Sequence, residues 1–324
     1  MQQRAPTLPS ERLQGWFEAG ESLSFRGHSI FYRRSADFAA SQHPVLVLIH
    51  GFPTASFDWQ ALWPTLAERY RLLAPDLLGY GFSAKPLTHD YSIPEQADLI
   101  EHLLEAHGVG DWHCLAHDVG DTVAQELLAR EIERRAAGGS RRRLLSLALL
   151  NGGLFVETQR PRLMQKLLRS PLGPALARLL GRRRFGRSFS QVFAPGHQPS
   201  ALELDEFWAL IAHADGQLLA PRLLGYIDER VRHRERWVGA LVASPLPLRF
   251  INGLLDPISG AHMVRRYREL VPAADVVELA DIGHYPQCEA PDRVLAAFLD
   301  FHRHLATQQL RGGPGCARSG RAAG

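Results

Sequence analysis

The chain has 324 residues, of which 45% are hydrophobic and 22% are charged, and its net charge at neutral pH is +3. These ordinary values predict a soluble globular protein with one large α/β domain and an insertion, or with two domains. No apolar run approaches the roughly 18 residues that a membrane helix needs, and so small a charge implies no nucleic-acid partner.

The two ends of the chain and its cysteines indicate the compartment. Residues 1–21 form an N-terminal extension without the basic start and apolar block of a secretory signal, and residues 307–324 are expected to be a disordered tail. Cys114, Cys288 and Cys316 cannot form a disulfide framework and lack metal-ligand spacing. We therefore expect a cytoplasmic protein that acts on a small molecule, with no metal ion, no cofactor and no membrane partner.

Strand and helix patterns alternate through the first half of the chain. The expected strands cover residues 44–49, 72–74, 112–116 and 145–150, after an opening hairpin at 23–26 and 29–33. Between them, helical spacing occurs near residues 59–70, 94–107 and 120–134. This alternation predicts an α/β fold with a mostly parallel central sheet and helices on both faces.

The rhythm changes after residue 151. Leucines and other apolar residues then recur at helical spacings without a strand-like run, which predicts an inserted helical cap over residues 152–238. Strand patterns return at 247–252 and 276–279, and helical patterns from residue 260 and over 291–305. The predicted core therefore consists of residues 22–151 and 239–306.

The most informative motif lies where the strand at 112–116 meets the next helix. Asp118 stands between Ala116 and Gly120, two small residues of the kind that a nucleophile elbow needs. The following helix offers backbone amides and the positive end of its dipole. The alternative is that Asp118 merely caps that helix, since aspartate is a favoured N-cap residue.

Two later loops carry the partners of such a nucleophile. Asp256 and His284 follow the last two expected strands, and the order nucleophile, acid, histidine is that of an α/β-hydrolase. Asp281 lies in the same short loop as His284 and is the weaker candidate for the acid, while the amide of Asn151 cannot replace an anion. We therefore predict the catalytic residues Asp118, Asp256 and His284.

The loop after the strand at 44–49 completes the expected site. The backbone amides of Phe52 and Val119 would form an oxyanion hole, although the loop could also be a simple turn that ends the strand. His117 is expected to pack or to donate a hydrogen bond. His50, Trp208 and His213 are possible pocket residues, although core packing is the preferred role for Trp208.

Several of these motifs together resemble the epoxide hydrolase and haloalkane dehalogenase branch of the α/β-hydrolase superfamily. The segments that carry the resemblance are residues 50–53, 117–120, 256–257 and 283–284. The resemblance implies a covalent mechanism in which the aspartate displaces a leaving group from a saturated carbon and water then hydrolyses the ester. A carboxylate suits this step because, with a reference pKa of about 3.9, it is already anionic at neutral pH.

The leaving group decides between the two substrate classes of that branch. Haloalkane dehalogenases often place an asparagine at the position of Phe52, and Val119 has no side-chain donor, so the sequence favours an epoxide. By resemblance, Tyr226 of the cap is the candidate acid for the leaving alkoxide, and a buried aromatic is its alternative role. Haloalkane dehalogenation, carboxylester hydrolysis and a catalytically silent ligand-binding protein remain the other functions considered.

Overall fold

A central sheet organises the computed structural model, which describes residues 8–139, 141–160 and 162–312. Within these residues the sheet has eight strands, of which β1 and β2 form an antiparallel hairpin, β2 pairs antiparallel with β4, and all further pairs are parallel. Their spatial order is β1 (Gly20–Phe25), β2 (His28–Arg34), β4 (Arg71–Pro75), β3 (Val45–Ile49), β5 (Asp111–His117), β6 (Arg143–Leu150), β7 (Leu248–Gly253) and β8 (Val276–Leu279). The predicted mostly parallel sheet is confirmed.

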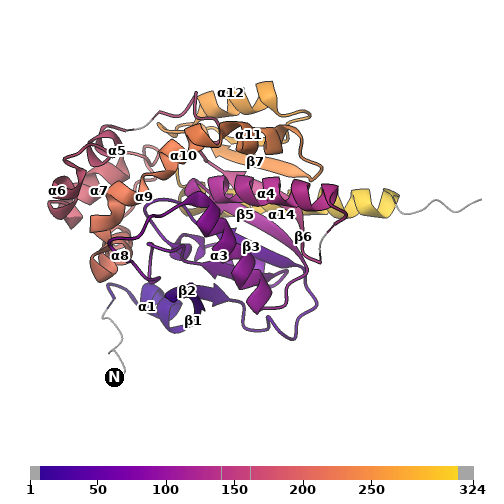
Figure 1. Ribbon diagram of the computed structural model, residues 1–324, viewed down its shortest axis with the longest axis horizontal. Coiled ribbons are helices and arrows are strands. Elements are labelled where there is room, and N and C mark those ends of the chain that lie inside the picture. The colour runs from indigo at the N-terminus through magenta and orange to yellow at the C-terminus, as the bar shows by residue number, and fades with distance from the viewer. Residues whose placement is uncertain (1–7, 140, 161, 313–324) are drawn as a thin grey trace, which may run out of the picture.

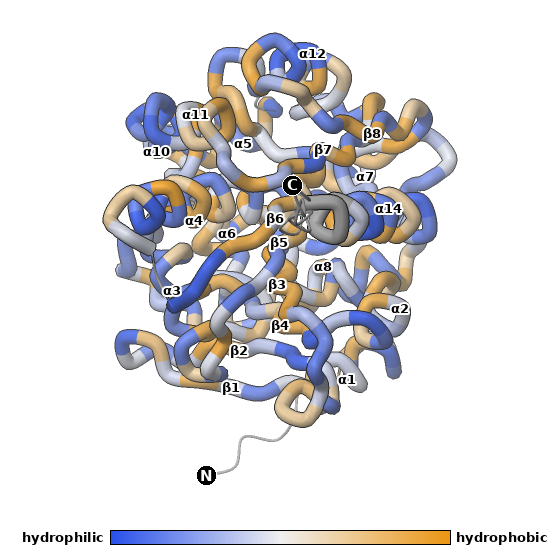
Figure 2. Tube along the Cα trace, turned by 90° about the vertical axis from the view of Figure 1, so that its right-hand side faces the viewer, coloured by the Kyte–Doolittle hydropathy of each residue, from blue (hydrophilic) through white to orange (hydrophobic). Residues whose placement is uncertain are grey.

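Helices cover both faces of this sheet, as predicted. Alternate residues of β3 pack into opposite layers: Val45, Val47 and Ile49 face one hydrophobic cluster, and Leu46 and Leu48 face the other. Figure 2 shows the strands between α3 and α4 on one side and α2 and α14 on the other. The first layer contains α3 (Ile93–Ala106), α4 (Val119–Ala136) and α12 (Ala261–Leu270), and the second contains α1 (Glu11–Glu18), α2 (Trp63–Ala67) and α14 (Pro291–Gly312).

The chain between β6 and β7 is helical, and we call residues 163–242 the helical insertion. Its elements are α5 (Leu163–Leu168), α6 (Gly173–Arg178), α7 (Arg182–Ser190), α8 (Ala201–Ala212), η2 (His213–Leu219), α9 (Ala220–Leu223), α10 (Tyr226–Arg232) and α11 (Arg234–Val242). Helices α5 to α9 gather at one end of the molecule, whereas α11 lies along α4 (Figure 1). The predicted boundary at residue 238 therefore falls inside α11, and a separate cap domain over 152–238 stays a proposal.

The structure differs from the sequence prediction mainly at the ends of the chain. Helix α1 lies in the predicted N-terminal extension and packs Leu13 and Trp16 into the second layer. Helix α14 continues to Gly312 and so includes residues 307–312, the first part of the predicted tail, while the disorder of that tail stays a prediction. The rest of the tail lies outside the described residues.

The remaining differences are small. The expected helix at 59–70 is shorter and follows a 3₁₀ turn, η1 (Ser56–Trp59), and a short helix, α13 (Pro286–Glu289), follows the loop of His284. Across residues 8–139, 141–160 and 162–312, no helix combines the length and apolar character needed to span a bilayer. The cytoplasmic location stays a prediction.

Candidate active site

Asp118 lies on a strained turn between β5 and α4. Its φ of 48° and ψ of −105° are rare for a residue with a side chain. A Cβ atom on Gly120 would lie 2.3 Å from the carbonyl oxygen of Ile49, so the turn needs glycine there. Asp118 does occupy the N-cap position of α4, but its carboxylate makes no capping hydrogen bond in that helix. Capping alone therefore does not explain this residue.

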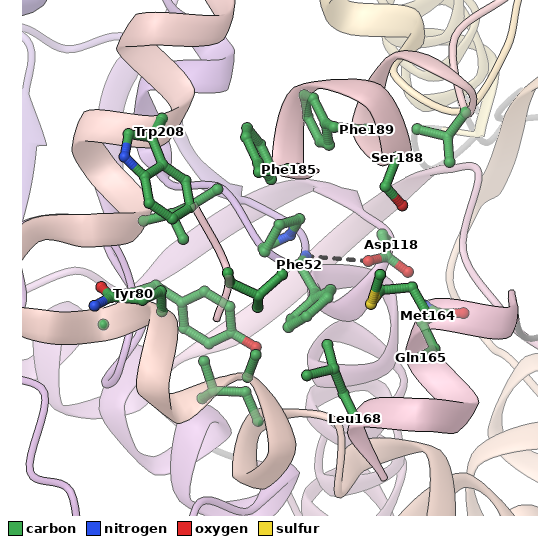
Figure 3. Close-up of a pocket in the computed structure, with 18 of the residues that line it drawn as sticks. Phe52, Tyr80, Asp118, Met164, Gln165, Leu168, Phe185, Ser188, Phe189 and Trp208 are labelled. Atoms are coloured by element: carbon green, nitrogen blue, oxygen red, sulfur yellow. Dashed lines mark hydrogen bonds between the residues drawn. The ribbon is translucent and has the colours of Figure 1, made fainter. Parts of the chain in front are cut away.

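The Asp118 carboxylate instead faces the loop after β3. The backbone amide of Phe52 donates to Asp118 Oδ2 at 3.0 Å, and Figure 3 marks this bond. The hydroxyl of Tyr285 donates to the Phe52 carbonyl at 2.9 Å and so holds the loop in place. Val119 is the first residue of α4, directly after Asp118. The two predicted oxyanion-hole residues thus adjoin Asp118, Phe52 through a hydrogen bond from its backbone amide and Val119 through its place at the start of the helix.

Asp256 and His284 form a buried pair. The Nδ1 atom of His284 lies 2.7 Å from Asp256 Oδ2, and both side chains are buried. Burial lowers the pKa of His284, but the charge and hydrogen bond of Asp256 outweigh this and raise it to about 9. Burial raises the pKa of Asp256, whereas His284 and two further donors lower it to about 2. The pair is therefore built to favour an imidazolium beside a carboxylate.

The alternatives to Asp256 have other roles in the structure. Asn151 donates from Nδ2 to Asp256 Oδ2 at 3.0 Å and accepts from the backbone of Gly253, so it positions the acid. Asp281 accepts from Arg293 at 2.6 Å at the surface. His117 donates from Nε2 to the backbone carbonyl of His284 at 2.8 Å, and burial lowers its pKa to about 3, so it is neutral. This is the hydrogen-bonding role expected for His117.

A residue that sequence reasoning missed is Arg230 of α10. Its buried guanidinium donates to the Thr122 hydroxyl at 2.9 Å and to the Asp118 carbonyl at 3.2 Å. Its Nη2 atom also lies 3.7 Å from Asp118 Oδ1. A buried arginine needs such partners, and here they come from Asp118 and from Thr122 in the first turn of α4. No local motif signals this contact, because 112 positions separate the two residues.

A mostly apolar cavity of about 130 Å³ lies beside Asp118 and His284. Asp118 and His284 lie in its wall together with the rings of Phe52 and Tyr80. Figure 3 shows Met164, Leu168, Phe185, Phe189 and Trp208 of the helical insertion around the Asp118 carboxylate. A small apolar molecule would fit beside the carboxylate and the imidazole.

The candidate acid Tyr226 is not among the described residues that line the main cavity. It lines a smaller adjoining pocket, where the guanidinium of Arg230 lies 4.6 Å from the centre of its ring. Tyr80, which follows β4 and was not considered from the sequence, lines both this pocket and the main cavity. Neither phenol hydroxyl has a hydrogen-bond partner among the described residues. Burial raises the pKa of both tyrosines, and the neighbouring Asp118 adds to the effect.

Of the three possible pocket residues, only Trp208 is among the described residues that line the cavity. Trp208 lines the cavity, which corrects the preference for core packing, whereas His50 and His213 lie outside the lining formed by the described residues. His50 accepts from the backbone of Leu77 at 2.9 Å. The ring of His213 packs on Phe82, and its carbonyl accepts from the buried amine of Lys85 at 2.9 Å. Both histidines therefore make their contacts away from the cavity.

The sheet order, the turn after β5 and the position of the cavity are those of an α/β hydrolase. A family model described as the alpha/beta hydrolase fold matches residues 44–291, and the chain belongs to this family. The mesoderm-specific transcript protein of Mus musculus is 43% identical over 303 residues, which cover 91% of this chain and 89% of that protein. Residues 76–83 and 284–287 of the sequence also resemble that protein, and the identity over most of the chain confirms the resemblance.

Two further proteins show similarity over most of the chain. The putative hydrolase LipZ of Mycobacterium tuberculosis (strain CDC 1551 / Oshkosh) is 40% identical over 294 residues, covering 91% of this chain and 99% of that protein. The crystal structure of the haloalkane dehalogenase DbeA-M1 loop variant from Bradyrhizobium elkanii superposes with a TM-score of 0.74 at 20% identity, covering 90% of this chain and 99% of that one. At this identity the superposition shows the shared fold alone.

Proposed function

We propose that this α/β hydrolase opens the epoxide ring of a small apolar molecule through an ester on Asp118. The observation that carries the proposal is the cavity itself, in which an aspartate on a nucleophile elbow shares an apolar wall with His284 and Tyr80. A carboxylate in an apolar cavity attacks a saturated carbon without help from a base.

In the first half of the proposed reaction, an oxygen of Asp118 forms a bond to one epoxide carbon. The bond between that carbon and the ring oxygen breaks, and the oxygen leaves as an alkoxide that needs a proton. Tyr80 supports this step because its hydroxyl is without a partner in the described part of the chain and its raised pKa keeps it protonated at neutral pH. Tyr226 is the second candidate donor, from the adjoining pocket.

In the second half, water hydrolyses the ester. Neutral His284 removes a proton from water, which attacks the carbonyl carbon of the Asp118 ester, and Asp256 stabilises the imidazolium that forms. The amides of Phe52 and Val119 would stabilise the oxyanion of the tetrahedral intermediate. As the intermediate collapses, the oxygen that leaves in the diol takes the proton from the His284 imidazolium, and the proton of the Asp118 carboxyl returns to the tyrosine that gave one up. The restored carboxylate then faces Arg230.

Haloalkane dehalogenation is the second candidate function, and the position of Trp208 favours it. Its indole lines the cavity and makes no hydrogen bond within the described residues, so its N–H could hold a departing halide. In contrast, Trp237 donates to Glu126 at 2.8 Å and is unavailable. Phe52 and Val119 provide no side-chain donor next to the nucleophile, and the epoxide therefore remains the preferred substrate class.

The mass of a trapped intermediate tests the proposal. The His284→Ala variant is incubated with panels of epoxides, haloalkanes and carboxylic esters, and the peptide that contains Asp118 is weighed. An epoxide adds its full mass, a haloalkane adds its mass minus that of the hydrogen halide, and Asp118→Asn serves as the unlabelled control. An epoxide adduct is expected. Its absence, with no turnover of epoxides by the parent protein, would overturn the proposal, and an adduct from haloalkanes alone would establish the second candidate.

A further inference from the structure

Positive charge is concentrated in the helical insertion. Residues 158–202 contain nine arginines and lysines and no aspartate or glutamate, although the whole chain has a net charge of only +3. The remainder of the chain is therefore net negative. These basic residues are Arg160, Arg162, Lys166, Arg169, Arg178, Arg182, Arg183, Arg184 and Arg187.

Most of this charge is not neutralised by neighbouring acids. Arg169 pairs with Asp228, and Arg182 pairs with Asp205 at 2.5 Å. Arg162 and Arg184 donate to neutral oxygens. Five basic side chains are exposed and form no ion pair with any residue that the structure describes: Arg160, Lys166, Arg178, Arg183 and Arg187.

The same helices expose large apolar side chains. Leu163 is 72% exposed and Leu167 is 41% exposed, and because they lie four residues apart on α5 they share one face of it. Leu172 and Leu179, beside the two ends of α6, are 68% and 60% exposed. Leucines in this number among basic residues are unusual on a surface that meets only water. We call these four leucines and the five exposed basic residues the basic leucine face.

The helices that carry this face also supply part of the wall of the active-site cavity. Met164 and Leu168 of α5 line the cavity, as do Leu180, Arg184 and Phe185 near and within α7. Figure 3 shows Met164 and Leu168 directed towards the cavity, while their neighbours Leu163 and Leu167 are exposed. Helix α5 thus separates the apolar cavity from the basic leucine face by its own width.

We propose that the basic leucine face binds the surface of an anionic phospholipid bilayer. The exposed leucines would enter the boundary between headgroups and acyl chains, and the arginines and Lys166 would contact lipid phosphates. The cavity would then open beside the bilayer, from which an apolar substrate enters it. This peripheral contact needs no membrane-spanning helix, and it replaces the expectation of no membrane partner, which rested on the small net charge and the absence of an apolar span.

Vesicle binding by the full chain tests this proposal without any turnover. Co-sedimentation is measured with vesicles of phosphatidylcholine alone and of phosphatidylcholine mixed with phosphatidylglycerol. We expect at least about tenfold stronger binding to the anionic vesicles, decreasing as salt is added. Each basic residue near such a surface contributes about fivefold, so loss of two arginines lowers binding about 25-fold. The two new carboxylates are repelled by the anionic lipids as well, and Arg183→Glu with Arg187→Glu should therefore lower binding on the order of a hundredfold.

Leucine variants and matched controls complete the experiment. Leu163→Ser with Leu172→Ser should lower binding by about tenfold or more. The controls are Arg265→Glu on α12 and Val242→Ser, a 39% exposed residue at the end of α11. Both lie on elements away from α5 to α7 (Figure 1) and should bind like the parent.

Three results would overturn the proposal. The first is equal binding to neutral and anionic vesicles, and the second is equal loss in the variants and their controls. The third is binding to another partner instead, seen as an oligonucleotide that is bound when vesicles are not, or as self-association that the leucine variant abolishes in light scattering. None of these results depends on which bond the enzyme hydrolyses, so they leave the proposed epoxide activity to its own test.

Discussion

Replacing Asp256 with asparagine should separate the two halves of the proposed reaction. The His284 pKa rises from its usual 6.5 to about 9, mainly through Asp256, against the effect of burial. A shift of this size corresponds to about 3 kcal/mol of imidazolium stabilisation, or about 10²-fold in rate. The amide of asparagine can also hold His284 in the wrong tautomer. With that effect included, the rate of ester hydrolysis should fall by up to about 10⁴-fold. Alkylation of Asp118 needs no base and should slow by less than about tenfold.

Rapid quenching followed by intact-protein mass spectrometry measures both halves, with an epoxide that the parent turns over. The Asp256→Asn variant should accumulate one ester per chain and then turn over very slowly. Asp281→Asn is the matched control, because Asp281 lies in the loop of His284 but pairs with Arg293 at the surface; its rates should change by about twofold at most. If no ester accumulates and the first turnover slows as much as the steady state, the assignment of Asp118 as nucleophile and Asp256 as acid is wrong.

Three further changes have defined outcomes. Ester hydrolysis needs neutral His284, so its rate should rise with pH. The midpoint should lie below about 9, because the negative charge of Asp118 raises the His284 pKa and the ester removes that charge. A flat pH–rate profile would contradict this. Arg230→Met removes a buried guanidinium from its partners and should lower the free energy of unfolding by about 3 kcal/mol in denaturant titrations; a change below about 1 kcal/mol would show that these contacts are weak. Tyr80→Phe should lower kcat/KM for epoxides by about 10²-fold or more, with a smaller effect for Tyr226→Phe, and an equal loss for haloalkanes would argue against a proton-donating role.

Local patterns were sufficient to predict the sheet and the residues that end its strands. The run at 44–49 is apolar at every position because β3 is buried on both faces, and Asp118 follows a similar run in β5. The carboxyl ends of parallel strands lie at one edge of a sheet, which is why Asp118, Asp256 and His284 could be grouped from their order alone. Helix α1 was missed because it is short and depends on tertiary burial of Leu13 and Trp16.

The sequence by itself determined the family, the order of the strands along the chain and the chemistry available after each strand. Only the tertiary structure decided that Arg230 faces Asp118, that Tyr80 lines the cavity beside it, and that Trp208 lines it while His213 does not. Helical periodicity indicates which residues share a face, but not what that face contacts. For the same reason the sequence placed the leucines of residues 163–180 in a helical cap without showing which of them are buried, whereas the fold leaves Leu163 and Leu172 exposed among arginines.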